Sequence, residues 1–574
     1  MADGTVRLPS APARARTFAG LRTLKSPQGW LPALAVAIGV VLIASPFLAT
    51  VVRSLLVGED GSLAAGLGNF IGMFGNKRFW EALGMTAIMG TGATLLACLF
   101  GLGLAWIVAR TDLPGRNWFD TLNLIPFFLS PFVGAVSWTY LAAPNVGLLN
   151  QLLAALGLPA DLLNIYSVGG VIWVLALFYT PYVYLFIISP MRRMDPALED
   201  AARAHGAGFW LTLRHVTAPL MMPALLSGAL VVFVTSAGLF DVPLALASPH
   251  GIRTIPTTVF QLVQYPSDYG LASAIGVMVM AVTVLITLMQ RNYLSRRSFA
   301  TVTGKGYRPR TVQLGRWKMA ALALELVYIG GGVVAPMAAL VMVALSPLWT
   351  GKPEPSSFTL VNFEFVLFNH DMARRAMMNS LIVATLGATV GVLVGTLQSY
   401  YLQRGRSRLR TIMDAFLSLP IGIPGIILGL GFLILALRTP LYSTLWIILI
   451  AYIARFLPFA TRGISAMLVS LSTDLEESAR ASGATWLQTM RMIVLPLIWP
   501  AILAAWLMLF VIFIRELGAT ILLYAQGTET ISVAMVIMGE MNFGYVAALA
   551  VIQALLLFVA FALFRLTRSS LLEN

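Results

Sequence analysis

The chain has 574 residues, of which 58% are hydrophobic and only 11% are charged, and its mean hydropathy is +0.84. This composition excludes an ordinary soluble protein and indicates an all-α polytopic membrane protein, because apolar stretches of about twenty residues recur along the chain. The net charge of +14 does not indicate a nucleic-acid partner, since the basic residues gather between alternate apolar stretches.

The first predicted element is a basic N-terminal segment, residues 1–28, which we interpret as an uncleaved cytoplasmic tail. About twelve transmembrane helices are expected after it, at roughly residues 31–52, 82–108, 118–142, 169–190, 222–242 and 270–290, and then 319–345, 378–402, 411–437, 440–465, 497–522 and 546–566. A basic cytoplasmic linker, residues 291–318, separates the first repeat, residues 29–290, from the second, residues 319–574. Because the number of spans is even and Lys and Arg concentrate on one side, both termini are expected in the cytoplasm.

The two halves are copies of one another. Residues 198–225 recur at 475–502 when 277 is added to each number, with 13 identities in 28 positions. A shift of 294 matches a second set of residues, Arg110, Asp120 and Pro126, with Arg404, Asp414 and Pro420. This duplication, with six spans in each half, predicts two parallel repeats related by an axis along the membrane normal.

The repeated segment carries a short motif of fixed spacing. It reads acid, Ala or Ser, Ala, three residues, Gly, and a proline follows the glycine by thirteen residues. Small alanines let another surface approach a helix closely, and glycine permits a sharp change of direction. The motif resembles the EAA signature of the membrane permeases of ATP-driven (ABC) importers, in which this loop forms a coupling helix that docks on an ATPase subunit.

The resemblance covers about residues 29–570 and implies a fused double permease with the type I ABC importer permease fold. The expected coupling loops are residues 191–223 and 466–500. The residues that the resemblance assigns to ATPase coupling are Glu199, Asp200, Ala201, Ala202 and Gly206, with Glu476, Glu477, Ser478, Ala479 and Gly483 in the second copy. The acids are expected to face the positive helix N-terminus and an arginine of the partner. An amphipathic loop that merely covers helix ends is the alternative.

The resemblance implies two copies of a cytoplasmic ABC ATPase and a periplasmic substrate-binding protein as partners, besides the lipid bilayer, in a bacterial inner membrane. ATP and Mg are expected on the ATPase, and no cofactor on this chain, because the sequence lacks the phosphate-binding loop G-x-x-x-x-G-K-[ST]. No catalytic residues and no metal site are expected either, since the four histidines lack metal-ligand spacing and no nucleophile–base pair is recognisable.

Charged residues inside the apolar spans are further candidates for function, because an intramembrane charge is costly and usually faces a partner or an aqueous path. Asp241, Arg455, Arg515 and Glu516 are predicted to line the substrate pathway or its gate. We expect Arg515 to pair with an acid, so that surplus negative charge faces the path. The alternative is an internal salt bridge that fixes two helices.

Three segments bear on the substrate. Residues 238–243 and 269–272 look similar to the ferric-iron permeases, whereas residues 515–524 look at least as close to permeases for aminoethylphosphonate. The prediction is a permease that moves ferric iron from periplasm to cytoplasm by alternating access. The alternatives are aminoethylphosphonate, a polyamine, thiamine or an inorganic anion as substrate. A secondary transporter and a membrane enzyme are the alternatives from other classes. Neighbouring genes for an ATPase and a secreted binding protein would favour the importer, whereas a lone gene would favour the others.

Overall fold

Long apolar helices dominate the fold, because a helix satisfies its own backbone hydrogen bonds where the bilayer offers no water. The computed structural model describes residues 27–58, 64–295, 311–405 and 409–572. Nearly all of the predicted tail, residues 1–28, and most of the predicted linker, residues 291–318, lie outside these ranges.

The first half contains the following elements. They are α2 (Pro27–Ser54), β1 (Leu56–Val57) paired antiparallel with β2 (Ala64–Ala65), α3 (Gly68–Gly75), α4 (Lys77–Arg110), α5 (Arg116–Leu122), α6 (Ile125–Phe128), α7 (Pro131–Ala142), α8 (Leu148–Ala155), α9 (Val168–Arg193), α10 (Pro196–Ala204), α11 (Phe209–Thr212), the π-helix η1 (Leu213–Thr217), α12 (Ala218–Ala237), α13 (Asp241–Leu246), η2 (Ser248–His250), α14 (Ile255–Val263) and α15 (Tyr269–Ser295).

The second half repeats this order. Its elements are η3 (Gly315–Trp317), α16 (Lys318–Ile329), η4 (Gly330–Val334), α17 (Ala335–Leu345), η5 (Pro355–Ser357), α18 (Val361–Glu364), η6 (Phe365–Asn369), α19 (Asp371–Arg404), α20 (Arg410–Leu417), η7 (Leu419–Gly422), α21 (Gly425–Ala436), α22 (Leu445–Ser470), α23 (Asp474–Ala481), α24 (Trp486–Thr489), η8 (Met490–Val494), α25 (Leu495–Ile514), α26 (Thr520–Leu523), α27 (Ile531–Met538) and α28 (Phe543–Leu572).

The duplication predicted from the sequence is confirmed by the order and length of the long helices. Helices α4 and α19 have the same length and differ by 294 in numbering, whereas α9 and α22, like α12 and α25, differ by 277. The offset falls by 17 because 25 residues separate α7 from α9 but only 8 separate α21 from α22. The extra residues of the first half include helix α8.

The prediction of about twelve spans holds with one correction. Among the described residues, ten helices are long and apolar enough to cross a membrane, and two bent pairs bring the number to twelve if each pair is one span. The expected third and ninth spans, 118–142 and 411–437, are these bent pairs, with bends of 98° and 105°. Ser130 and Ile423 at the bends have extended backbones, because each precedes a proline, which disfavours the helical conformation.

Three π-helices lie next to prolines in the middle of long helical runs. Segments η1, η4 and η8 each end two residues before a proline, namely Pro219, Pro336 and Pro496. A proline has no N–H to donate to the preceding turn, and a π-turn is a common local adjustment of a helix. The helical runs therefore begin upstream of Pro219 and Pro496, at Phe209 and Trp486, inside the expected coupling loops.

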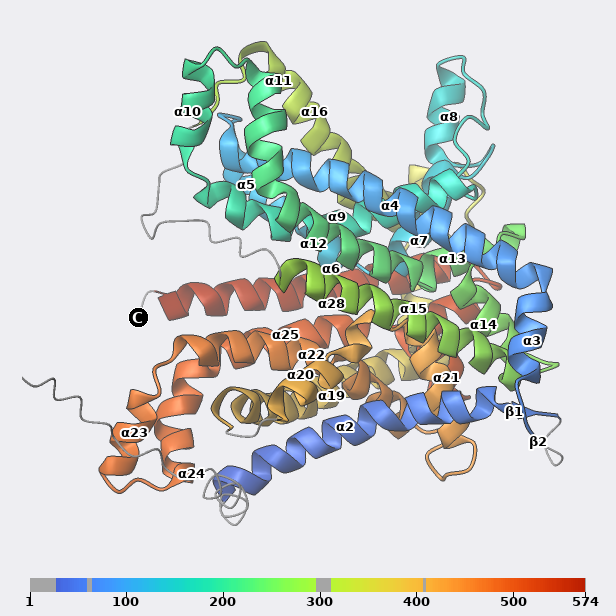
Figure 1. Cartoon of the computed structure of the whole chain (residues 1–574). Coiled ribbons are helices and arrows are strands. Elements are labelled where there is room, and N and C mark those ends of the chain that lie inside the picture. The colour runs from blue at the N-terminus through green and yellow to red at the C-terminus, as the bar shows by residue number, and fades with distance from the viewer. Residues whose placement is uncertain (1–26, 59–63, 296–310, 406–408, 573–574) are drawn as a thin grey trace, which may run out of the picture.

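The first span of each half packs on the bundle of the other half. Helix α2 contacts α19 and α21, and Gln398 donates a hydrogen bond to the Ala35 carbonyl at 2.9 Å. In the reverse direction, the Tyr328 hydroxyl on α16 donates to the Leu177 carbonyl on α9 at 3.2 Å. This exchange ties the halves together, and Figure 1 shows α2 lying along α19 and α21 rather than along α4.

The two repeated loops lie at the same end of the molecule. Figure 1 shows α10 and α11 at the upper left, α23 and α24 at the lower left, and the C-terminal end of α28 between them. The hairpin of β1 and β2, with α3, α8 and α14, lies at the opposite end, which we call the outer end. The two repeats therefore run in the same direction, as predicted.

Candidate functional site

Each expected coupling segment is a short helix followed by a glycine in the left-handed conformation. Helices α10 and α23 precede Gly206 and Gly483, whose φ angles are +83° and +85°. Only glycine adopts this region without strain, so the expected sharp change of direction is confirmed at both positions. Nothing lies within 4 Å of a Cβ built on either glycine, so the constraint comes from the backbone and not from crowding.

The acid immediately before each motif, Glu199 or Glu476, is buried and paired inside the protein. Glu199 is 8% exposed and forms an ion pair with Arg110 at the C-terminal end of α4, and it also accepts a hydrogen bond from Thr217 at 2.9 Å. Glu476 is 5% exposed and pairs with Arg404 at the end of α19, with Nε to Oε1 at 2.8 Å. These pairs attach α10 to α4 and α23 to α19.

The geometry corrects the expectation of a partner's arginine for Glu199 and Glu476, but does not test it for the motif acids Asp200 and Glu477. Glu199 and Glu476 point inward because each meets a guanidinium that the fold itself supplies. The signal for this pairing is in the sequence, since both the acids and the arginines are duplicated. The exposed members of the expected coupling set are Ala201, Gly206, Glu477, Ser478 and Gly483, while Asp200, Ala202 and Ala479 are half-buried.

The four charged residues expected at the pathway come together where the two halves meet. Arg455 on α22 forms an ion pair with Glu516, which follows α25. The same carboxylate accepts a hydrogen bond from the Ala519 N–H at 2.9 Å. Asp241, at the start of α13 in the first half, is buried and lies within electrostatic range of Glu516, Arg455 and Arg515.

Arg515 binds backbone carbonyls of the first half and forms no ion pair with an acid among the described residues. Its guanidinium donates to the Phe127 carbonyl and, at 3.1 Å, to the Leu129 carbonyl, and it lies 5.4 Å from the centre of the Phe127 ring. These carbonyls end α6 at the bend of the third span, where the helix leaves acceptors without intrahelical donors. The expectation that Arg515 pairs with an acid is wrong, because Arg455 takes that place at Glu516.

The cluster thus combines a structural ion pair with an unbridged acid. The Arg455–Glu516 pair matches the alternative of a salt bridge that fixes two helices. Asp241 forms no ion pair within 4.0 Å among the residues that the structure describes. Among all the residues that the structure describes, no group of three or more His, Cys, Asp or Glu side chains could hold a metal ion.

Comparison with known proteins gives two matches to one family. The model of the binding-protein-dependent transport system inner membrane component matches residues 93–299 and residues 387–571. A ferric transport system permease protein of Actinobacillus pleuropneumoniae is 25% identical over 455 residues, which are 78% of this chain and 65% of that protein. An Fe(3+)-transport system permease protein of Haemophilus influenzae is 24% identical over 517 residues, 89% of this chain and 92% of that protein.

A third relative bears another substrate in its name. A protein of Salmonella paratyphi A named for 2-aminoethylphosphonate transport is 31% identical over 202 residues, which are 35% of this chain and 75% of that permease. The two family units together cover more than half of the sequence, at the positions of the two structural repeats. The chain belongs to the family of binding-protein-dependent transport system inner membrane components, as a fused double permease.

Proposed function

We propose that this chain is the permease of an ATP-driven importer that moves ferric iron from the periplasm to the cytoplasm by alternating access. The observation that carries the proposal is the pair of family units in one chain, combined with relatives named for ferric iron that align with 78% and 89% of it. The relatives are permease subunits, so ATP hydrolysis is assigned to a separate ATPase.

The proposed partners bind at the two ends of the molecule. Two copies of the ATPase bind beneath α10 and α23, one at each coupling loop, and carry the ATP and Mg. A periplasmic binding protein delivers the solute at the outer end. In this proposal both termini lie in the cytoplasm of the bacterial cell, and the chain requires no cofactor or catalytic residue of its own.

The charge cluster suits a small, highly charged cation. Ferric iron favours hard oxygen ligands, and carboxylates supply them. Arg455 neutralises Glu516, whereas Asp241 keeps an unbridged carboxylate at the contact between the halves. In this proposal Asp241 provides a transient electrostatic well for iron, and the Arg455–Glu516 pair and Arg515 position the helices around it.

A second candidate substrate is 2-aminoethylphosphonate. It is favoured by the Salmonella relative and by the two guanidinium groups of the cluster, since arginine binds phosphonate and phosphate oxygens in a fork geometry. In the structure both guanidinium groups already have acceptors within the protein, Glu516 for Arg455 and two carbonyls for Arg515, which favours the iron proposal.

The test is uptake by the transporter reconstituted in liposomes with its ATPase and its binding protein. ATP-dependent uptake of radiolabelled iron, and none of labelled 2-aminoethylphosphonate, is the expected result. Asp241→Asn and Glu516→Gln should both lower iron uptake at unchanged membrane abundance. A binding protein that retains aminoethylphosphonate and ignores iron would transfer the assignment to the second candidate.

A further inference from the structure

A polar pocket of about 170 Å³ opens at the outer end of the first half. Its polar walls are Asn76 and Arg78 at the start of α4, Arg253 before α14, and Thr258 and Gln261 on α14. The apolar walls are Phe79, Leu262, Leu271 and Ile275. Because one liquid water occupies about 30 Å³, the pocket has room for a carboxylate together with a few waters.

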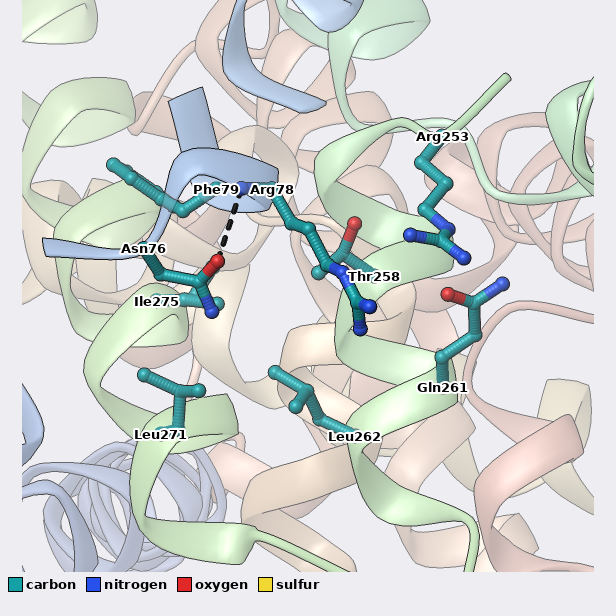
Figure 2. A pocket seen from close by; sticks show the side chains of 9 residues that line it. All are labelled: Asn76, Arg78, Phe79, Arg253, Thr258, Gln261, Leu262, Leu271 and Ile275. Atoms are coloured by element: carbon teal, nitrogen blue, oxygen red, sulfur yellow. Dashed lines mark hydrogen bonds between the residues drawn. The ribbon is translucent and has the colours of Figure 1, made fainter. Parts of the chain in front are cut away.

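Two guanidinium groups face this pocket without an acid between them. Figure 2 shows the side chains of Arg78 and Arg253 directed toward the same space, with Gln261 below Arg253. The pocket walls contain no Asp or Glu, and neither arginine forms an ion pair within 4.0 Å among the described residues. Two nearby cations beside apolar walls favour an oxyanion, since arginine binds carboxylate and phosphate oxygens in a bidentate manner.

The backbone holds the two arginines in a fixed relation. The Asn76 side chain caps α4 by accepting a hydrogen bond from the Arg78 N–H at 2.9 Å. Thr254, next to Arg253, begins α14 with a capping box. The Ile255 N–H donates to the Thr86 hydroxyl at 2.8 Å and so joins α14 to α4. The backbone at both arginines is therefore fixed before a ligand arrives, which lowers the entropic cost of binding.

At the matching positions, the second half lacks the two arginines and the glutamine that line this pocket. Adding 294 to Arg78 gives Met372, and adding the 276 that relates α14 to α27 converts Arg253 to Glu529 and Gln261 to Ile537. Glu529 is buried and accepts a hydrogen bond from the Gly527 N–H at 3.0 Å. The family scaffold does not require the two arginines, because the repeat that shares the scaffold lacks them.

We propose that the pocket of Arg78 and Arg253 is a docking site for a carboxylate side chain of the periplasmic binding protein. This inference rests on the proposed function, in which the outer end receives that protein. The matching positions of the second half, Met372 and Glu529, offer no arginine pair. A binding protein that spans both halves then docks in one orientation only, since complementary charge fixes register and on-rate.

The experiment uses the full chain with its ATPase in nanodiscs of phosphatidylcholine alone, and measures the affinity of the binding protein. Stimulation of ATP hydrolysis by the binding protein is first established for the wild type. The double variant Arg78→Ala with Arg253→Ala should weaken docking at least tenfold and reduce its salt dependence, at unchanged basal ATP hydrolysis. Arg375→Ala, an exposed arginine at the outer end of the second half, is the matched control and should change nothing.

Charge exchange tests the contact directly. Arg253→Glu should weaken docking about a hundredfold, and replacing one acid of the binding protein by lysine should restore it. Inorganic phosphate, compared with chloride at equal ionic strength, should compete for docking in the wild type and not in the double variant. Rescue by an acid-to-lysine exchange separates a docking contact from a loss of folding.

Two results would overturn the proposal while leaving the transport function intact. One is docking within twofold of the wild type in the double variant. The other is an effect of the arginines that appears only in nanodiscs containing phosphatidylglycerol, which would assign the pocket to a lipid headgroup. A wild-type transporter that the binding protein fails to stimulate would instead refute the proposed function, and this inference with it.

Discussion

Replacing Glu199 by glutamine should destabilise α10 more than the same change at Glu476 destabilises α23. The Arg110 side chain is 1% exposed, and its Nε and Nη1 atoms have no hydrogen-bond partner among the described residues. Removing the charge of Glu199 leaves a buried cation without an anion, which costs about 3 kcal/mol or more. Since 1.4 kcal/mol corresponds to a factor of ten, local opening of α10 should rise roughly 100-fold.

The second copy should respond less. Arg404 is 16% exposed and also donates to the carbonyls of Leu471 and Leu468, at 2.9 and 3.3 Å, so Glu476→Gln leaves it partly satisfied. A loss of about 1 kcal/mol, or roughly fivefold faster opening of α23, is expected. Hydrogen exchange of peptides covering α10 and α23 in the full chain measures the local opening of each helix. Glu477→Gln on the exposed face of α23 is the control. Exchange of α10 within twofold of the wild type, or a larger response of α23, would refute the reasoning.

Three further changes test other contacts. Valine at Gly206 and Gly483 should cost about 1–3 kcal/mol of stability at each left-handed backbone. These substitutions should also reduce the ATP hydrolysis that the binding protein stimulates, at normal membrane abundance. Unchanged transport in the double mutant would exclude these loops as coupling elements. Arg515→Gln should accelerate hydrogen exchange at the bend between α6 and α7, because it weakens the bonds to the carbonyls there. The Lys318 ammonium, 2.8 Å away, and a backbone N–H lower the pKa of Asp112 below its ordinary 3.8. The Asp112–Lys318 ion pair should therefore persist above pH 3.8 and be lost as the pH falls through the lowered pKa of Asp112. A spin-label distance between residues 113–115 and 311–314 should therefore lengthen in acid, and Asp112→Asn should lengthen it already at neutral pH.

The spans, the duplication and the direction of the repeats could be predicted because they depend on features that the chain carries locally. A bilayer-spanning helix needs a long apolar run, and hydropathy reports such runs directly. The bends of the third and ninth spans were missed for the same reason. Hydropathy averages over Pro131 and Pro424, and the extended residue before each proline changes the direction of the helix without changing its polarity.

The sequence predicted which residues belong to the charged site, but it predicted only part of their geometry. Intramembrane charge is rare enough that Asp241, Arg455, Arg515 and Glu516 could be selected from the sequence, and the structure brings all four together. Their pairing depends on distances between helices that are far apart in sequence. Arg515 meets carbonyls nearly 400 residues away, and those carbonyls are available only because the third span is broken at that point.

The distribution of these residues between the repeats has a physical reason. The residues that hold the proposed coupling helices α10 and α23 are duplicated, as Arg110 with Glu199 and Arg404 with Glu476 show. The central charges occur once: a shift of 277 converts Arg515, Glu516 and Arg455 to Gly238, Leu239 and Phe178, and Asp241 to Gly518. Each half needs its own coupling helix, because in the proposed transporter each faces its own ATPase. One path between the halves needs only one set of charges, and a second set would add the cost of burying ions without serving another path.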